Sequence, residues 1–266
     1  MILRNMRKKD ISIVEEYLKN NNLNTYSMNQ TVTLESVRNE ISFKMSTKTP
    51  NHKKLVKAID TSSITVCYGM AGTGKTYTAV QKALQLFQKG KINKIYLIKS
   101  VTALQGEELG FMKGTMKEKV EPFAYSFMHA FKKIVGESTV RKLEHLDVIE
   151  FIPIAFLRGV SIQPDAIVLV DEAQNISITS MRTIVTRIEK GCALVMLGDT
   201  RQVDMKKGSQ SSLRYFIEKF RDFDRADMEF IEFTAEDQMR NDLIVKLEAR
   251  FEELEEEDPD MFTGKR

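Results

Sequence analysis

A glycine-rich octapeptide limits what this chain can fold into more than any other feature of its sequence. Residues 69–76 read Gly-Met-Ala-Gly-Thr-Gly-Lys-Thr, which fits the pattern G-x-x-x-x-G-K-[ST] at every defined position. A β-prone apolar run precedes the octapeptide at 64–68, and a helix with one apolar face is predicted over 75–88. A strand, a glycine-rich turn and a helix in this order predict a phosphate-binding loop (P-loop).

The residue types in this loop suit a nucleoside triphosphate. Glycines let backbone N–H groups face a phosphate, and the following helix directs the positive end of its dipole at the same anion. Lys75 is expected to contact the β- and γ-phosphates, and the Thr76 hydroxyl to ligate Mg²⁺. We therefore predict ATP and Mg²⁺ as ligands. The predicted nucleotide-binding residues of this segment are Gly69, Met70, Ala71, Gly72, Thr73, Gly74, Lys75, Thr76 and Tyr77.

Apolar strand-like runs alternate with amphipathic segments along most of the chain. This alternation predicts an α/β fold of the P-loop NTPase type, with a doubly wound, mainly parallel sheet flanked by helices. The expected strands cover 64–68, 95–98, 148–152, 167–170, 193–197 and 228–233. The expected helices cover 75–88, 122–135 (with Pro122 in the first turn), 178–188 and 211–220, and a last helix carries Met239, Leu243, Leu247 and Phe251.

The two ends of the chain differ from this pattern. Residues 1–48 are rich in Asn, Ser, Thr and Lys, and we interpret them as a small N-terminal appendage with a helix near 11–18 and a strand near 31–37. The P-loop domain is expected to span 49–256, followed by a C-terminal tail at 257–266. The acidic run at 252–258 is typical of the solvated end of a helix.

Composition narrows the class of protein. The formal net charge of +3 does not by itself indicate a nucleic-acid binder. Cys67 and Cys192 each lie in an apolar run, which is typical of core thiols, and the three histidines form no metal-ligand pattern with them. No run approaches the roughly 18 apolar residues of a membrane span, and the N-terminus lacks a signal peptide. We expect a cytoplasmic protein without a membrane partner.

Two carboxylates follow the most apolar of the predicted strands. Residues 167–170 are apolar throughout, as in a strand covered on both faces, and Asp171 and Glu172 come next. In a P-loop fold this strand end lies beside the phosphate site. Asp171 is then expected to hold Mg²⁺, directly or through water, and Glu172 to act as the general base on the attacking water. The second carboxylate favours hydrolysis over phosphoryl transfer to a small molecule.

A third strand end carries Gly198-Asp-Thr-Arg-Gln202. The Gln202 side chain can donate and accept hydrogen bonds, which suits it to sense a γ-phosphate and its loss on hydrolysis. By itself, Gly198-Asp199 reads equally well as an ordinary turn.

Taken together, these motifs carry a family resemblance. Their order is that of superfamily 1 helicases, and the chain is more similar to the PhoH-like family of P-loop ATPases over roughly residues 49–252. The segments that carry the resemblance are Gly69-Met-Ala-Gly-Thr-Gly-Lys-Thr-Tyr77, Gly106-Glu-Glu-Leu-Gly-Phe-Met-Lys-Gly114, Phe156-Leu-Arg-Gly159, Asp171-Glu-Ala-Gln-Asn175, Gly198-Asp-Thr-Arg-Gln202 and Met239-Arg240.

The resemblance implies roles for four further residues. His52 stands where the family usually has a glutamine that reads adenine, and Gln174 is expected to contribute to nucleotide binding. Arg158 and Arg240 are candidates for an arginine finger that reaches across a subunit boundary, which suits a homo-oligomeric, hexameric ring. The alternative for each arginine is a surface ion pair. Lys99-Ser100 and Ser211-Ser212 depart from the family pattern, and this suggests a divergent, phage-encoded member.

The sequence leaves open which of two kinds of partner the predicted ATPase acts on. The first is single-stranded nucleic acid, RNA rather than DNA, which would make the chain a nucleic-acid-stimulated ATPase or helicase-like motor. Its candidate contacts are Lys113, Lys117, Lys119, Lys132, Lys133, Arg141, Lys142, Lys206 and Lys207, with Phe111 and Phe123 for base stacking. The alternative is a nucleotide-dependent switch or assembly module that acts on a protein. A small-molecule kinase is the third interpretation, and nothing marks its lid or acceptor pocket.

Overall fold

The computed structural model describes residues 32–100, 116–205 and 210–258, and its centre is one parallel sheet. The strands are β1 (Ile64–Gly69), β2 (Lys94–Lys99), β3 (Ile149–Phe151), β4 (Ala166–Asp171), β5 (Ala193–Gly198) and β6 (Met228–Phe233). Their order in the described sheet is β3-β2-β4-β5-β1-β6, and every adjacent pair is parallel. The predicted parallel α/β architecture is confirmed.

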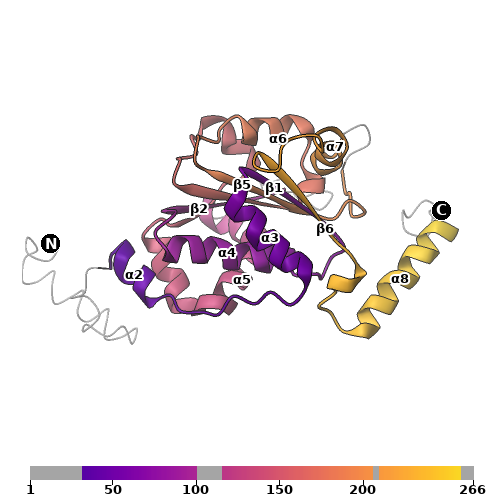
Figure 1. The fold of residues 1–266 in the computed structure, drawn as a ribbon, viewed down its shortest axis with the longest axis horizontal. Coiled ribbons are helices and arrows are strands. Elements are labelled where there is room, and N and C mark those ends of the chain that lie inside the picture. Colours follow the sequence, from indigo (N-terminus) through magenta and orange to yellow (C-terminus); the bar gives the residue numbers. More distant parts are fainter. Residues whose placement is uncertain (1–31, 101–115, 206–209, 259–266) are drawn as a thin grey trace, which may run out of the picture.

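Helices cover both faces of the sheet, as in a doubly wound fold (Figure 1). One face packs against α2 (Leu34–Glu40), α3 (Pro50–Thr61), α4 (Lys75–Gln88) and α5 (Met116–His145). The other face packs against the 3₁₀ helix η4 (Ile154–Gly159), α6 (Ile178–Val185) and α7 (Ser212–Lys219). Short 3₁₀ turns η5 (Ala173–Asn175) and η6 (Ala235–Asp237) follow β4 and β6, and α8 (Asp242–Glu257) ends the described chain.

Alternate residues of the central strands enter two separate hydrophobic cores. On β4, Ile167 and Leu169 contribute to one core while Val168 and Val170 contribute to the other. All six residues of β4 are buried, which explains its uninterrupted apolar sequence. Cys67 and Cys192 are free, buried thiols, as expected from their apolar surroundings. Within the described ranges, no helix combines the length and apolar character that crossing a bilayer requires.

The structure corrects the prediction for the segment near residue 31. Instead of a strand, residues 34–40 form α2. The cause is a capping box: the Thr33 side chain accepts the Ser36 N–H, and the Ser36 side chain accepts the N–H of Thr33. Val37 and Ile41 are buried in the same core as α4 and α5, so this part of the N-terminal appendage packs on the domain. The helix predicted near 11–18 lies outside the described residues.

The helix predicted to begin at Pro122 begins six residues earlier, at Met116. Pro122 therefore does not lie in the first turn. The element continues to His145 as two helices joined at Gly136, whose φ of 78° and ψ of 160° interrupt the helical backbone. The predicted end of the first helix at residue 135 agrees with this break. The helix expected over 178–188 is shorter in the structure, where α6 ends at Val185.

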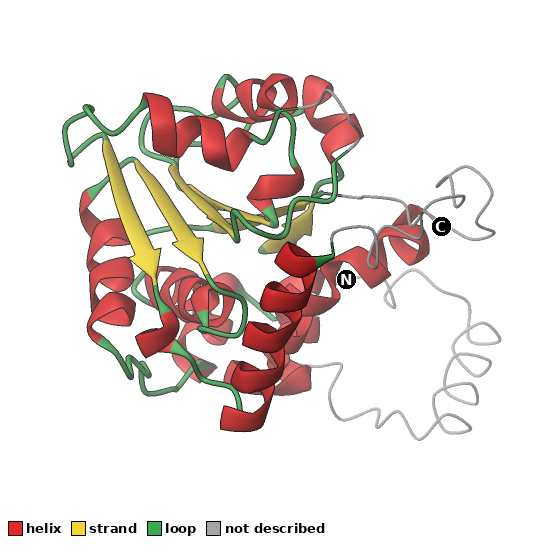
Figure 2. Ribbon diagram, turned by 90° about the vertical axis from the view of Figure 1, so that its right-hand side faces the viewer, coloured by secondary structure: helices red, strands yellow, loops and turns green. Residues whose placement is uncertain are grey.

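The carboxyl ends of the parallel strands meet at one edge of the sheet, and this places the predicted motifs together. β5 lies between β1, which leads into the P-loop, and β4, which leads into Asp171 and Glu172. β6 lies on the other side of β1 and forms the edge of the described sheet. Figure 2 shows the parallel strands from the side. Ligand sites of open α/β sheets lie at this carboxyl edge.

Candidate nucleotide-binding site

The phosphate loop turns sharply out of β1 and enters α4. Gly69 has a φ of +123°, and an added Cβ would lie 1.9 Å from the backbone oxygen of Phe233. Only glycine fits this close approach of two strands. α4 begins at Lys75, as predicted, with Gly74 in the left-handed region as its N-cap. The first turn of α4 therefore directs unpaired backbone N–H groups toward the loop, which is the anion site that a helix N-terminus provides.

The Lys75 side chain lies in the centre of the loop. Its Nζ donates to the carbonyl oxygens of Gly69 and Met70, both at 2.7 Å, and lies 3.3 Å from Thr73 Oγ1. Lys75 is 8% exposed, and burial lowers the pKa of its ammonium group below the usual value. A cation held in a desolvated loop gains more from a phosphate than an exposed one, because water screens it less.

A hydroxyl and a carboxylate meet beside the loop. Thr76 Oγ1 donates to Asp171 Oδ1 at 3.1 Å, and Ser126 Oγ donates to Asp171 Oδ2 at 3.2 Å. Mg²⁺ holds its ligands at about 2.1 Å in an octahedron, so adjacent ligand oxygens lie about 3 Å apart. The Thr76–Asp171 pair therefore fits two adjacent positions. The described residues contain no cluster of three or more His, Cys, Asp or Glu that could hold a metal.

Asp171 is buried, and its environment favours a cationic partner. Burial and the neighbouring Glu172 carboxylate raise the pKa of Asp171 above its usual value. Lys99 at the end of β2 acts in the opposite direction on that pKa. A divalent cation at this position would lower that pKa by direct attraction to the carboxylate.

Glu172 has a backbone conformation that few non-glycine residues adopt, with a φ of 53° and a ψ of 40°. Left-handed residues of this kind are found at functional sites, where surrounding structure holds them in place. Its Oε2 accepts a 2.6 Å hydrogen bond from Gln174 Nε2, and its Oε1 lies 3.9 Å from Lys99 Nζ. The side chain is 38% exposed, so water can reach the carboxylate. This arrangement suits a general base.

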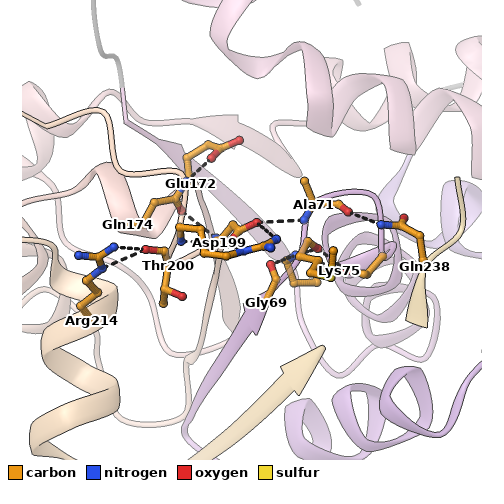
Figure 3. Close-up of polar contacts among 12 residues, drawn as sticks. Gly69, Ala71, Lys75, Glu172, Gln174, Asp199, Thr200, Arg214 and Gln238 are labelled. Atoms are coloured by element: carbon orange, nitrogen blue, oxygen red, sulfur yellow. Dashed lines mark hydrogen bonds and ion pairs between the residues drawn. The ribbon is translucent and has the colours of Figure 1, made fainter. Parts of the chain in front are cut away.

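Gln174 links this carboxylate to the end of β5. It is fully buried, and its Oε1 accepts the backbone N–H of Asp199 at 3.1 Å while its amide nitrogen donates to Glu172. Asp199 in turn accepts the backbone N–H of Ala71 at 3.1 Å through Oδ2. Figure 3 shows this series of contacts from Glu172 to the phosphate loop. Gln174 therefore lies behind the site, where it connects the two strand ends.

Contacts within the turn that follows β5 hold Asp199 in place. It is 4% exposed, and Arg201 pairs with it through a 3.1 Å contact from Nη2 to Oδ2. Arg214 of α7 donates from Nε and Nη2 to the carbonyl oxygen of Thr200, at 2.9 and 2.5 Å (Figure 3). These contacts fix the turn that follows β5, and with it the acceptor for Ala71.

A second contact to the loop comes from the segment after β6. Gln238 Nε2 donates to the carbonyl oxygen of Ala71 at 3.0 Å, and the backbone N–H of Met239 donates to that of Gly72 at 3.1 Å. The Arg240 side chain lies over Gly72, since a Cβ added to Gly72 would be 2.4 Å from Arg240 Nε. The structure thus places Arg240 against the phosphate loop of its own chain.

His52 supports the loop from α3. Its Nε2 lies 2.9 Å from the carbonyl oxygen of Thr73, and its Nδ1 faces the backbone N–H and the hydroxyl of Thr49, at 3.1 and 2.8 Å. The Thr49 hydroxyl donates to Asp237 at 2.5 Å. Two acceptors at Thr73 and Asp237 and one donor at Thr49 N require the neutral Nε2–H tautomer. His52 is 3% exposed, and burial lowers its pKa.

The remaining predicted site residues are more dispersed. Gln202 is exposed, and its backbone N–H donates to the carbonyl oxygen of Asp199 at 3.3 Å. Tyr77 packs partly buried against the core, with Lys133 Nζ 5.7 Å from its ring centre. Arg158 belongs to η4, and its side chain lies outside what the structure describes. The Gly106–Gly114 segment is also outside the described residues.

The described basic residues of α5 are engaged with neighbours. Lys132 and Arg141 both pair with Glu137, and Lys142 pairs with Glu40 at 2.6 Å. Among the other candidates for nucleic-acid contacts, the side chains of Lys113, Lys117, Lys119, Lys206, Lys207, Phe111 and Phe123 lie outside the described residues.

Sequence reasoning missed several residues that position the loop. Ser126, Asp199, Asp237 and Gln238 belong to no short motif that by itself indicates a phosphate site. The one local signal among them is the acidic residue directly after the apolar run of β5, which reads equally well as a turn.

A parallel sheet with a phosphate loop after β1 and an acidic strand end at β4 defines a P-loop nucleotide-binding protein. Within that class, residues 44–252 match the model of the "PhoH-like protein" family. The chain belongs to the PhoH-like family.

Curated relatives agree with this assignment. A PhoH-like protein of Mycobacterium tuberculosis (strain ATCC 25618 / H37Rv) is 37% identical over 209 residues, which cover 77% of this chain and 58% of the relative. The PhoH-like protein of Bacillus subtilis (strain 168) is 35% identical, covering 75% and 61%. Protein PhoH of Escherichia coli (strain K12) is 27% identical, covering 71% and 52%. The chain therefore spans little more than half the length of these relatives. A solved structure described as an ATPase domain shares 12% identity and covers 85% of this chain and 84% of its own, with a TM-score of only 0.27.

Proposed function

We propose that this chain hydrolyses ATP with Mg²⁺. The observation that carries the proposal is the meeting of Thr76 and Asp171 at 3.1 Å directly beside Glu172, whose backbone is left-handed and whose carboxylate is open to water. Lys75, the residue before Thr76, holds its ammonium group within the loop at 2.7 Å from the Gly69 carbonyl oxygen. This set would supply a phosphate cradle, a magnesium ligand pair and a base at one edge of the sheet.

Each of these groups has a role in the proposed reaction. Lys75 and the N-terminus of α4 bind the β- and γ-phosphates and offset the charge that develops on their oxygens. Thr76 and Asp171 would hold Mg²⁺, which, when bound, neutralises phosphate charge and fixes the leaving group. Glu172 accepts a proton from the attacking water, and Gln174 orients the Glu172 carboxylate through its 2.6 Å hydrogen bond. Gln202 is proposed to sense the γ-phosphate, and Arg240 to stabilise the transferred group.

The finer proposal is a nucleic-acid-stimulated ATPase that works as a hexameric ring, with single-stranded RNA favoured over DNA. The order of motifs along the chain supports the nucleic-acid motor. The ring is proposed because one P-loop domain can move along a strand only together with neighbouring copies. Binding that depends on phosphate contacts would weaken steeply as salt rises.

A second candidate is a nucleotide-dependent switch that acts on a protein partner. Two observations favour it. The Lys132, Arg141 and Lys142 side chains form ion pairs with acidic residues, which reduces the positive charge available to a nucleic acid. The contacts from Glu172 through Gln174 and Asp199 also connect the proposed base directly to the phosphate loop. Loss of the γ-phosphate could therefore change both regions together.

One experiment separates these candidates. ATP turnover is measured with and without single-stranded RNA and single-stranded DNA, at low and moderate salt, with the oligomeric state followed in parallel. Lys75→Ala serves as the inactive control. Stimulation by RNA that fades with salt supports the nucleic-acid motor, whereas turnover indifferent to both polymers favours the switch. Turnover equal in wild type and Lys75→Ala would reject the proposed ATPase site altogether.

A further inference from the structure

An apolar stripe runs along α8 on the surface of the molecule. Leu243, Ile244, Leu247 and Phe251 are 61%, 40%, 45% and 55% exposed. With about 100° between successive helical residues, these four lie within an arc of about 100° on one face of α8. Figure 1 shows α8 standing away from the sheet and its covering helices. Large apolar side chains gathered on one exposed helix face mark an interaction surface.

The C-terminal half of α8 adds strong negative charge to this stripe. Residues 252–258 contain six carboxylates in seven positions, and Glu253, Glu257 and Asp258 are exposed. Arg250 pairs with Glu253 at 2.7 Å, and residues 250–258 hold one basic side chain against six carboxylates. A surface that receives α8 should therefore combine an apolar floor with a basic border.

The same chain carries such a surface between α3 and the edge strand β6. This groove has a volume of about 760 Å³, and its floor includes Ala58, Phe230 and Ile231. Lys54 and Lys57 of α3 stand exposed on its border. Over the described part of the chain, neither lysine makes an ion pair. At the other border, Arg225 and Glu229 pair with each other at 3.6 Å, and Glu232 accepts a 3.2 Å hydrogen bond from the Tyr68 hydroxyl. The two lysines thus remain available to acidic groups.

We propose that the α8 stripe of one copy docks in the α3–β6 groove of a second copy of this chain. The helix and the groove are different patches, so the contact is heterologous and propagates from copy to copy until a ring closes. A second copy is the occupant we favour because apolar stripe meets apolar floor and the acidic end meets Lys54 and Lys57. This inference rests on the proposed assembly of the ATPase, and it names the contacting surfaces.

Docking at α8 would also reach the nucleotide site. α8 begins two residues after Arg240, which lies over Gly72, and the backbone N–H of the preceding Met239 bonds the Gly72 carbonyl oxygen. A neighbour that fixes α8 would therefore fix the segment that contacts the phosphate loop. We expect ATP turnover per chain to rise with protein concentration as copies associate.

The test uses the full chain with ATP and Mg²⁺ in sedimentation velocity over a range of concentrations. The stripe variant is Leu247→Glu with Phe251→Glu, and Ala249→Glu on the opposite face is its matched control. The groove variant is Lys54→Glu with Lys57→Glu. We expect each interface variant to associate at least tenfold more weakly than wild type, while the Ala249→Glu protein associates normally. Circular dichroism and ATP affinity confirm that the variants fold.

Mixing the two interface variants gives the sharpest outcome. Each retains one intact half of a heterologous contact, so the mixture should form a heterodimer that grows no further. A wild-type chain that stays monomeric, normal association of the stripe variant, or a mixture without heterodimer would overturn the proposal. Because association is read without ATP turnover, its failure leaves the proposed hydrolytic site standing, and loss of turnover alone leaves the interface standing.

Discussion

Asp199 is predicted to hold the phosphate loop in its binding shape, and its replacement measures how much that support contributes. Asp199→Ala removes the acceptor of the Ala71 N–H, a 3.1 Å hydrogen bond to a buried carboxylate. Hydrogen bonds to charged groups contribute about 1.5–3 kcal/mol. If this free energy stabilises only the loop conformation that binds ATP, its loss weakens ATP binding by roughly 10- to 150-fold.

The assay is titration of a fluorescent ATP analogue, with urea unfolding measured on the same protein. Asp199→Asn is the matched control, because its amide oxygen still accepts the Ala71 N–H, and we expect it to lose much less affinity than Asp199→Ala. Unchanged ATP affinity in the alanine variant would refute the reasoning. A fall in unfolding free energy without a fall in affinity would show that Asp199 stabilises the fold and leaves the loop unaffected.

Three further predictions concern the chemistry and pH dependence of the site. Glu172→Gln should keep ATP binding and reduce turnover by about 10²- to 10⁴-fold, since it removes the proposed base; turnover near the wild-type rate would reject that assignment. Arg240→Ala should lower turnover by about 10²-fold even in dilute, monomeric protein, because the side chain lies over its own loop; a loss confined to assembled protein would place its action across a subunit boundary. Burial lowers the pKa of His52, so its neutral form stabilises the fold fully above pH 6.5, and that contribution is lost as pH falls below 6.5 through the folded pKa. Urea unfolding of wild type and His52→Gln should therefore differ in pH dependence between about pH 7.5 and pH 5, and parallel curves would contradict the prediction.

The parts of the site that sequence predicts best are those in which one short segment contains both the chemistry and its structural setting. The octapeptide at 69–76 carries its own strand and helix on either side, and α4 begins and ends at the predicted residues. The apolar run of β4 likewise indicates the strand end at Asp171. The parallel sheet follows from the alternation of such segments.

The supporting contacts could not be predicted in this way, because they join residues far apart in the chain. The family resemblance places His52 where relatives usually have a glutamine that reads adenine, and the contact of its Nε2 with the Thr73 carbonyl oxygen follows from no local pattern. Gln238 reaches Ala71 across 167 positions, and no local pattern marks either partner. The strand predicted near residue 34 is wrong for a different reason, since the capping residue Thr33 also has a high strand propensity.

The contacts behind the phosphate loop also determine when, during synthesis, the loop can reach its final conformation. Thr49 before β1 and Asp237 after β6 are joined across 188 positions, and the loop lies between them. During synthesis the octapeptide leaves the ribosome long before the segment that bonds Ala71 and Gly72. A nascent chain that ends before β6 thus carries the whole nucleotide motif without the contacts that Gln238 and Met239 make to it. Tight nucleotide binding would then report that the last strand has joined the sheet, and the ligand would act as a late checkpoint of folding.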